Sequence, residues 1–189
     1  DKYQATVTYT ATNGTVSLDK AVVTLLDADG NPAEDGTGHL AEGQIPAAAP
    51  ATGFDADTET WTERKPTTSV EIKGDTAFAV SWTEGSYGYI VNYHYDNAVE
   101  TVTGAAKFRE PIPYDTARKP EKAEGSFIYE RTVGEGKTVA ADSKDNVVDV
   151  YFTLDNVGTD PENPDVPDNV PDKYQATVTY TATNGTVSL

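Results

Sequence analysis

The sequence DKYQATVTYTATNGTVSL fills residues 1–18 and returns letter for letter at residues 172–189. Its residues 4–11 alternate between threonine or glutamine and the smaller set alanine, valine and tyrosine. This period of two predicts a β-strand with one buried face. Asn13-Gly14 is a pair strongly favoured in two-residue hairpin turns, and residues 15–18 follow it as a second predicted strand. Each copy is therefore expected to open a β-rich module with a hairpin.

The repeated unit is long, because its copies begin at residues 1 and 172, whereas solenoid and propeller repeats span roughly 20–50 residues. Identity at every position of the copy indicates a recent duplication, or an array kept uniform by recombination. We interpret the chain as one full repeat of several modules followed by the start of the next. Neighbouring repeats of the same chain are its first expected partners.

Composition excludes several classes of function. The chain has 31 Asp and Glu against 14 Lys and Arg, a formal net charge of −17, which repels nucleic acid and anionic membrane surfaces. It has no cysteine, so disulfides, thiolate metal sites and cysteine nucleophiles are excluded. It also has no apolar run approaching the roughly 18 residues of a membrane span.

Further strands are expected where apolar and β-branched residues gather between turn residues, at 21–26, 70–72, 78–82, 87–95 and 147–154. The tyrosines at 87, 89, 93 and 95 share one strand face with Val91, and we expect this tyrosine stripe to face a core. Residues 115–123 are the best candidate for a short helix, although Pro120 interrupts them. The predicted fold class is mainly β, with a small α+β character.

The expected domains are two modules, a linker and the start of another repeat. The first module covers residues 1–84 and the second residues 87–154, with Glu84-Gly85-Ser86 as the junction. Residues 155–171 are acidic and carry proline at 161, 164 and 167, a spacing that matches polyproline II and predicts a semi-rigid spacer. A linker of no set geometry is the alternative. Residues 172–189 begin the next repeat.

The second module carries a series of short motifs in a characteristic order. The motifs are Tyr89–Asp96, Val102–Phe108, Ile112–Tyr114, Gly125–Phe127, Gly136–Val139 and Asn146–Asp155. In these motifs and their order, the module resembles a MucBP-type (mucin-binding-protein) repeat.

The first module has its own set of motifs: Val7–Tyr9, Asn13–Thr15, Ala51–Phe54, Trp61 and Gly74–Trp82. In these residues it is similar to the β-rich repeats that accompany such domains, related in style to internalin B-repeats. The sequence departs from the usual Gly-Tyr-x-Phe before the tryptophan, since it has Gly53-Phe54-Asp55-Ala56 there. The two resemblances imply β-grasp-like folds on a wall-anchored, extracellular protein of gut Firmicutes, which are Gram-positive, with sortase anchoring elsewhere in the full protein. They also imply adhesion or binding to a host glycoprotein.

An enzyme is not expected. The chain has only two histidines, His39 and His94, and neither lies near a serine nucleophile motif. Asp55, Asp57 and Glu59 next to Trp61 form the one stretch that suggests a glycosidase, but a solvated loop beside a core tryptophan explains it better.

We also predict no metal and no cofactor. Residues 27–31 begin like a calcium loop, but they lack a third oxygen ligand before the glycine, and Gly38 falls where the twelfth-position glutamate belongs. A turn that connects strands explains them better. Weak calcium binding by the acids of residues 155–168, and a Lys-Asn isopeptide bond, stay open as lesser alternatives.

If the tyrosine stripe is buried, a ligand must bind elsewhere. The candidate ligand-binding residues are Ile90, Asn92 and His94, of opposite parity on the same strand, together with Trp61 and Tyr114 in or near loops. The leading hypothesis is multivalent binding of mucin or immunoglobulin by many identical weak sites. The alternative is a structural stalk that projects a distal adhesin and has no ligand of its own.

The second copy of the opening sequence needs a partner, because an isolated hairpin is marginal in water. We expect residues 172–189 to pair with one of the two modules or with a neighbouring molecule. Since the first module accepts the same sequence, strand exchange between chains is one such possibility.

Overall fold

A computed structural model describes residues 2–96, 98–123, 126–155 and 178–186. The chain divides into two compact units, Asp1–Tyr87 and Gly88–Leu189. Across the described residues the regular elements are β-strands and three-residue 3₁₀ turns, without an α-helix. The predicted mainly β fold class is confirmed.

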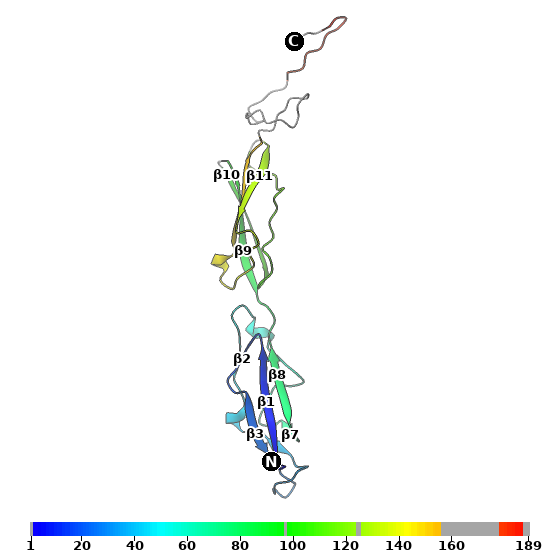
Figure 1. Cartoon of the computed structure of the whole chain (residues 1–189), viewed down its shortest axis with the longest axis vertical. Coiled ribbons are helices and arrows are strands. Elements are labelled where there is room, and N and C mark those ends of the chain that lie inside the picture. Colours follow the sequence, from blue (N-terminus) through cyan, green and yellow to red (C-terminus); the bar gives the residue numbers. More distant parts are fainter. Residues whose placement is uncertain (1, 97, 124–125, 156–177, 187–189) are drawn as a thin grey trace. The chain divides into compact units, whose positions relative to one another are not determined.

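Unit 1 is built on a four-stranded mixed sheet in the order β3-β1-β8-β6. Figure 1 labels three of these strands, β3, β1 and β8. β1 pairs antiparallel with β3 and parallel with β8, while β6 pairs antiparallel with β8. The opening strand of the unit therefore lies in the middle of the sheet beside a strand from the end of the unit. The bounds are β1 Gln4–Thr12, β3 Lys20–Thr24, β6 Thr60–Trp61 and β8 Thr76–Ser81.

Two small sheets and two 3₁₀ turns complete unit 1. β2 (Gly14–Val16) pairs with β5 (Ala48–Pro50), and β4 (Gly38–His39) pairs with β7 (Glu71–Ile72). The turns are η1 (Glu42–Gln44) and η2 (Ala56–Thr58).

The alternation in residues 4–11 produces the core of unit 1, as predicted. Val7 and Tyr9 are buried on one face of β1, and the Tyr9 ring stacks on Phe78 with centroids 5.9 Å apart. The Tyr9 hydroxyl donates to the carbonyl oxygen of Gln44 at 2.7 Å, and burial raises the pKa of Tyr9. Burial of one apolar face in this way is the main source of stability of a small sheet.

The predicted hairpin between β1 and residues 15–18 is wrong. Both edges of β1 are taken by β3 and β8, so β2 pairs with β5 instead. Asn13 has a left-handed φ of 64°, and its side-chain amide donates to the carbonyl oxygen of Trp82 at 3.2 Å. At Gly14, a Cβ would collide with the Trp82 ring and the Ala49 carbonyl oxygen. The Asn-Gly pair therefore turns the chain out of the sheet rather than back along β1.

Unit 2 has a second four-stranded sheet, in the order β10-β9-β12-β11. β9 and β12 run parallel in its middle, and β11 pairs antiparallel with β12. Both units thus have a four-stranded mixed sheet whose first and last strands are central and parallel. The β-grasp-like fold implied by the resemblance stays a prediction. The bounds are β9 Ser86–Tyr95, β10 Ala98–Lys107, β11 Phe127–Val133, η3 Ser143–Asp145 and β12 Val147–Leu154.

The tyrosine stripe faces the core of unit 2 from Val91 onward, as predicted. Val91, Tyr93 and Tyr95 are buried, whereas Tyr87 and Tyr89 are half-buried. Tyr95 stacks on Phe152 of β12 with centroids 4.8 Å apart.

The predicted helix at residues 115–123 is wrong, because these residues form an irregular loop. The Asp115 carboxylate accepts the amide N–H of Ala117 at 2.8 Å, a local turn that competes with helix formation, and Pro120 has no amide hydrogen to donate.

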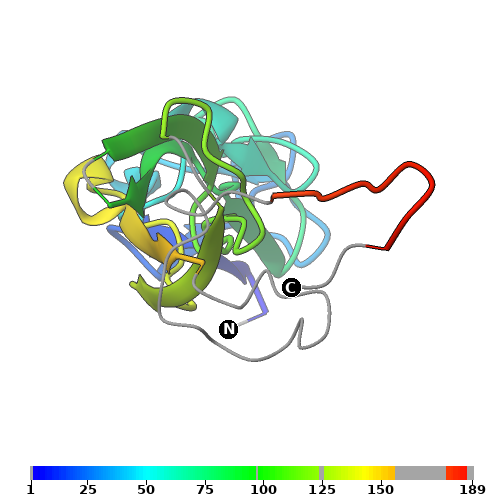
Figure 2. The same cartoon turned by 90° about the horizontal axis from the view of Figure 1, so that it is seen from above.

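The second copy of the opening sequence behaves differently from the first. Its described residues, 178–186, lie in no strand and are drawn as an open loop, red in Figure 2. Val178 and Tyr180 are 66% and 60% exposed, whereas the matching Val7 and Tyr9 are 0% and 3% exposed. The expected pairing with a unit of the same chain is therefore not seen there. Pairing with another chain stays a prediction, and linker residues 156–171 lie outside the described residues.

This contrast supplies a matched pair of substitutions. Val7→Ala should destabilise unit 1 by about 2 kcal/mol, because it removes buried methyl groups and leaves a cavity. Val178→Ala, in the same local sequence, should leave unit 1 unchanged. Both tryptophans, Trp61 and Trp82, lie in unit 1, so denaturation followed by tryptophan fluorescence measures that unit alone. Equal effects of the two substitutions would contradict the burial described here.

Candidate functional site

The sheet of unit 2 has an outward face that carries three of the five predicted binding residues. Ile90, Asn92 and His94 alternate along β9 with the buried residues 91, 93 and 95, so they point away from the core. The register places Val147 beside Ile90, Asp149 beside Asn92 and Tyr151 beside His94. On β11, Val133 lies beside Asp149 and Arg131 beside Tyr151. We call these residues, with Thr101 of β10, the outer face of unit 2.

A chain of hydrogen bonds crosses three strands of the outer face. Asp149 Oδ1 lies 2.8 Å from His94 Nε2 and accepts from the Asn92 amide at 3.1 Å. Asn92 in turn accepts from the Thr101 hydroxyl at 2.9 Å. Both His94 and Asp149 side chains are 28% exposed, so the group is open to solvent while its members hold each other in position.

The electrostatics of this group favour an ionised Asp149. Partial burial opposes the charge, but hydrogen bonds from His94 and Asn92, together with the charges of His94 and Lys137, outweigh it. The pKa of the Asp149 carboxyl is therefore held below its ordinary value. At neutral pH Asp149 is therefore a carboxylate held in position by its hydrogen bonds to His94 and Asn92. These two contacts use only part of its capacity to accept hydrogen bonds.

Aromatic rings lie beside the hydrogen-bonded group. The His94 and Tyr151 rings stack with centroids 4.3 Å apart and planes within 8° of parallel. The Arg131 guanidinium lies 3.9 Å from the centroid of the Tyr151 ring, within the range of a cation–π contact. The Tyr151 ring thus lies between His94 and Arg131. The outer face combines aromatic rings with polar groups, which is the combination that orients a bound ligand.

The other two predicted binding residues lie elsewhere. Trp61 belongs to unit 1, where it packs against the core and its indole N–H donates to Glu59 Oε1 at 2.7 Å. Glu59 also binds Lys65 at 2.7 Å, and these two hydrogen bonds lower its pKa. Tyr114 is half-buried in the loop between β10 and β11. Of the five residues, only Ile90, Asn92 and His94 share a surface.

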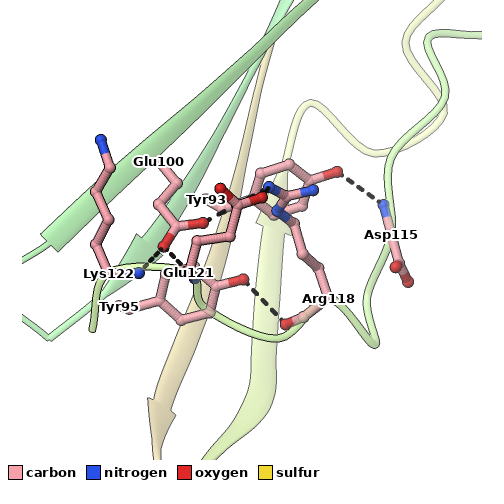
Figure 3. A network of polar contacts seen from close by, with 7 residues as sticks. All are labelled: Tyr93, Tyr95, Glu100, Asp115, Arg118, Glu121 and Lys122. Carbon is pink, nitrogen blue, oxygen red and sulfur yellow. Dashed lines mark hydrogen bonds and ion pairs between the residues drawn. The ribbon is translucent and has the colours of Figure 1, made fainter. Parts of the chain in front are cut away.

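The loop at residues 108–123 is fastened to the inner side of the unit 2 sheet by Glu100, whose side chain is only 6% exposed (Figure 3). Glu100 Oε1 accepts the amide N–H groups of Glu121 at 2.6 Å and Lys122 at 2.8 Å. The guanidinium of Arg118 lies 3.6 Å from the other carboxylate oxygen. Burial opposes ionisation of Glu100, but these hydrogen bonds and Arg118 outweigh it and lower its pKa.

Two core tyrosines hold the same loop. The Tyr95 hydroxyl donates to the carbonyl oxygen of Arg118 at 2.9 Å, and the Asp115 amide donates to the Tyr93 hydroxyl at 3.1 Å (Figure 3). Burial, reinforced by the nearby Glu100 charge, raises the pKa of Tyr95 to about 12. The hydroxyl is therefore a donor over the whole physiological range. A hollow of about 340 Å³ lies beside the loop, lined among others by Arg118, Phe127 and Phe152.

The acidic stretches highlighted by the sequence have local structural roles. Asp27 Oδ1 accepts the amides of Asp29 at 2.9 Å and Asn31 at 2.8 Å, and backbone hydrogen bonds, that from Asn31 first, lower its pKa. Asp55 caps η2 through the amide of Asp57 at 3.0 Å. Within the described ranges, no group of three or more His, Asp or Glu side chains is placed to hold a metal ion.

Comparison with protein-family models, curated proteins and solved structures finds no match for this chain. The resemblance to MucBP-type and internalin-B-type repeats therefore stays a hypothesis drawn from the motifs. In the part of the chain that the structure describes, no helix is both long and apolar enough to cross a membrane.

Glu100 should be critical for the stability of unit 2, although it lies on the opposite side of the sheet from the outer face. Glu100→Gln should destabilise unit 2 by about 2 kcal/mol, because it removes a buried charge that accepts two amides. Glu121→Gln is the matched control, since the Glu121 side chain is 72% exposed. Denaturation followed by the NMR signals of Val148 and Val150 reports on unit 2.

The destabilisation caused by Glu100→Gln should decrease as the pH falls. The pKa of Glu100 is lower in the folded state, so the unfolded chain binds more protons in acid. The stability that the charge contributes is present above the unfolded value of about 4.3 and is lost as pH falls through the folded value. The difference in the free energy of unfolding between wild type and Glu100→Gln should therefore become smaller below about pH 4. A difference that stays constant or grows in acid would contradict the described contacts.

Proposed function

We propose that this chain is a non-enzymatic, tandemly repeated module on the extracellular, wall-anchored surface of a Gram-positive bacterium, where it binds a host glycoprotein such as mucin or immunoglobulin. The observation that carries the proposal is the outer face of unit 2, a half-exposed group of aromatic, cationic and hydrogen-bonding side chains. The resemblance of the second module to MucBP-type repeats supports the same assignment.

The chemistry of the outer face suits a glycan or a polar protein surface. A sugar ring can contact the exposed edges of Tyr151 and His94, while Asp149, Asn92 and Arg131 offer acceptors and donors for its hydroxyls. Amphipathic aromatic rings with a few fixed polar groups are typical of such sites. An immunoglobulin domain has a second route, because β10 and β11 are the edge strands of the sheet and can pair with another strand.

Repetition supplies the affinity that one small site lacks. The letter-for-letter copies at residues 1–18 and 172–189 indicate identical modules in series. When one module is bound, its neighbours act at a high effective concentration, and avidity rises without any new contact.

Binding should depend on Tyr151 and not on Tyr114. Tyr151→Ala removes the ring that stacks on His94 and Arg131, and should weaken binding to purified mucin or immunoglobulin at least about tenfold, the loss of a central aromatic contact. Tyr114→Ala is the matched control from the loop. Surface plasmon resonance on the full chain measures both variants. If wild type binds neither ligand at high micromolar concentration, the proposal fails.

The alternative is a spacer stalk with no ligand of its own. One observation favours it: since the first and last strands of each four-stranded sheet run parallel, the chain enters and leaves that sheet at opposite ends. Such modules add length when joined in series. A stalk predicts no binding by any repeat and a maximum dimension, from small-angle scattering, that grows linearly with the number of repeats.

A further inference from the structure

The two units share one feature that ligand binding does not require. In unit 1, six residue pairs, from Val7 beside Thr76 to Thr12 beside Ser81, join the first strand to the last in parallel. In unit 2, six pairs from Ile90 beside Val147 to Tyr95 beside Phe152 do the same. The sequences of the two ladders are unrelated, yet the length and direction of the pairing are the same.

Parallel pairing decides how tension acts on a unit. The chain enters unit 1 at the start of β1 and leaves it beyond the end of β8. Tension along the chain therefore pulls the two strands past each other, along their own length. In this shear geometry the hydrogen bonds of the ladder, which are evenly spaced in a parallel pair, carry the load together. If both points of attachment were at the same end of the ladder, the bonds would break one after another.

Side chains close both ends of the unit 1 ladder, at the residues just outside the six pairs. Before the first pair, Asp75 Oδ1 accepts the amide N–H of Thr6 at 2.7 Å. After the last pair, the side-chain amide of Asn13 donates to the carbonyl oxygen of Trp82 at 3.2 Å. A ladder begins to open at its ends, where pairing is least supported. These two contacts lie at the points where opening would start.

Unit 2 closes its ladder with other residues. Asn146 is fully buried next to the first pair, and its side-chain amide donates to the carbonyl oxygens of Gly88 at 3.0 Å and Ala140 at 2.9 Å. The backbone carbonyl oxygen of Asn146 accepts the amide N–H of Ile90 at 2.8 Å. Within the ladder, Asp149 of β12 binds His94 and Asn92 of β9.

We propose that both units are shear clamps, and that the repeat has a load-bearing function in addition to any ligand. In a series of modules every module carries the full tension, so each must resist it separately, and both units have the same device. The inference does not depend on the proposed function: a clamp without a ligand and a ligand site without a clamp are distinguishable outcomes.

The test compares two pulling directions on the full chain. Because the chain has no cysteine, pairs of introduced cysteines define the points of attachment. Lys2→Cys with Glu84→Cys loads unit 1 in shear, and Lys2→Cys with Lys73→Cys places both attachments at the start of the ladder. Single-molecule force spectroscopy should give an unfolding force at least about twofold larger in shear, because six pairs must yield together. Equal forces in the two directions would overturn the proposal for unit 1.

Unit 2 is tested in the same way. Ser86→Cys with Asp155→Cys loads β9 and β12 in shear, and Ser86→Cys with Lys144→Cys peels them apart. The force in shear should again be the larger, and a unit 2 that yields equally in both directions overturns the proposal for that unit.

The end contacts provide a second, sequence-matched test. Asn13 and Asn184 occupy the same position in the two copies and have left-handed φ values of 64° and 60°. Glycine tolerates this conformation, so the substitution removes the side-chain contact without adding strain. Asn13→Gly should lower the unfolding force of unit 1 in shear, and Asn184→Gly should leave it unchanged. If Asn13→Gly changes the peeling force as much as the shear force, its contact is merely structural and the role assigned to it is wrong.

Discussion

The structure of each unit depends on the parallel pairing of its first strand with its last. This pairing places β1 and β9 in the middle of their sheets, where both edges are occupied and one face is buried. The other strands of the two four-stranded sheets flank it: β3 and β10 lie on one side of the central pair, and β6 and β11 on the other. To complete its sheet, each unit must therefore bring together its first and last strands, which are its most distant strands in sequence. Pairing between strands that are close in sequence does not by itself form the sheet.

Sequence periodicity predicted the strands well and their partners badly. Alternation located β1, β9 and β12 almost to the residue, because a period of two with one apolar face is a local signal. One of the two partners of β1 was not local. Asn13-Gly14 indicated a hairpin with residues 15–18, but β3 and β8 occupy the two edges of β1, and β8 begins more than sixty residues later. The loop at 115–123 was mistaken for a helix because its fastening residue, Glu100, lies on another strand.

The candidate site was partly predictable for the same reason. Once the tyrosine stripe is assigned to the core, parity places Asn92 and His94 on the opposite face, and the structure agrees. Tyr151, Asp149 and Arg131 were missed, because only the register between β9, β12 and β11 brings them beside His94 and Asn92. Alternation in residues 147–154 could have placed Asp149 and Tyr151 on the face opposite the buried valines. It could not have shown which residues of β9 and β11 lie beside them. Trp61 attracted interest as an aromatic residue near acids, but one of those acids, Glu59, accepts its indole N–H and holds it in place.

The letter-for-letter repeat also has a consequence for biosynthesis. Two segments of identical sequence could fill the one position between β3 and β8, and nothing in their side chains distinguishes them. A ribosome makes them in order, however, and residues 76–81 are complete long before residue 172 is added. Modules generally fold as units from the N-terminus during synthesis, at about 5–20 residues per second. During synthesis the first copy therefore has several seconds in which it can pair with β3 and β8 before the second copy exists. The order of synthesis, rather than the sequence, decides which copy takes that position.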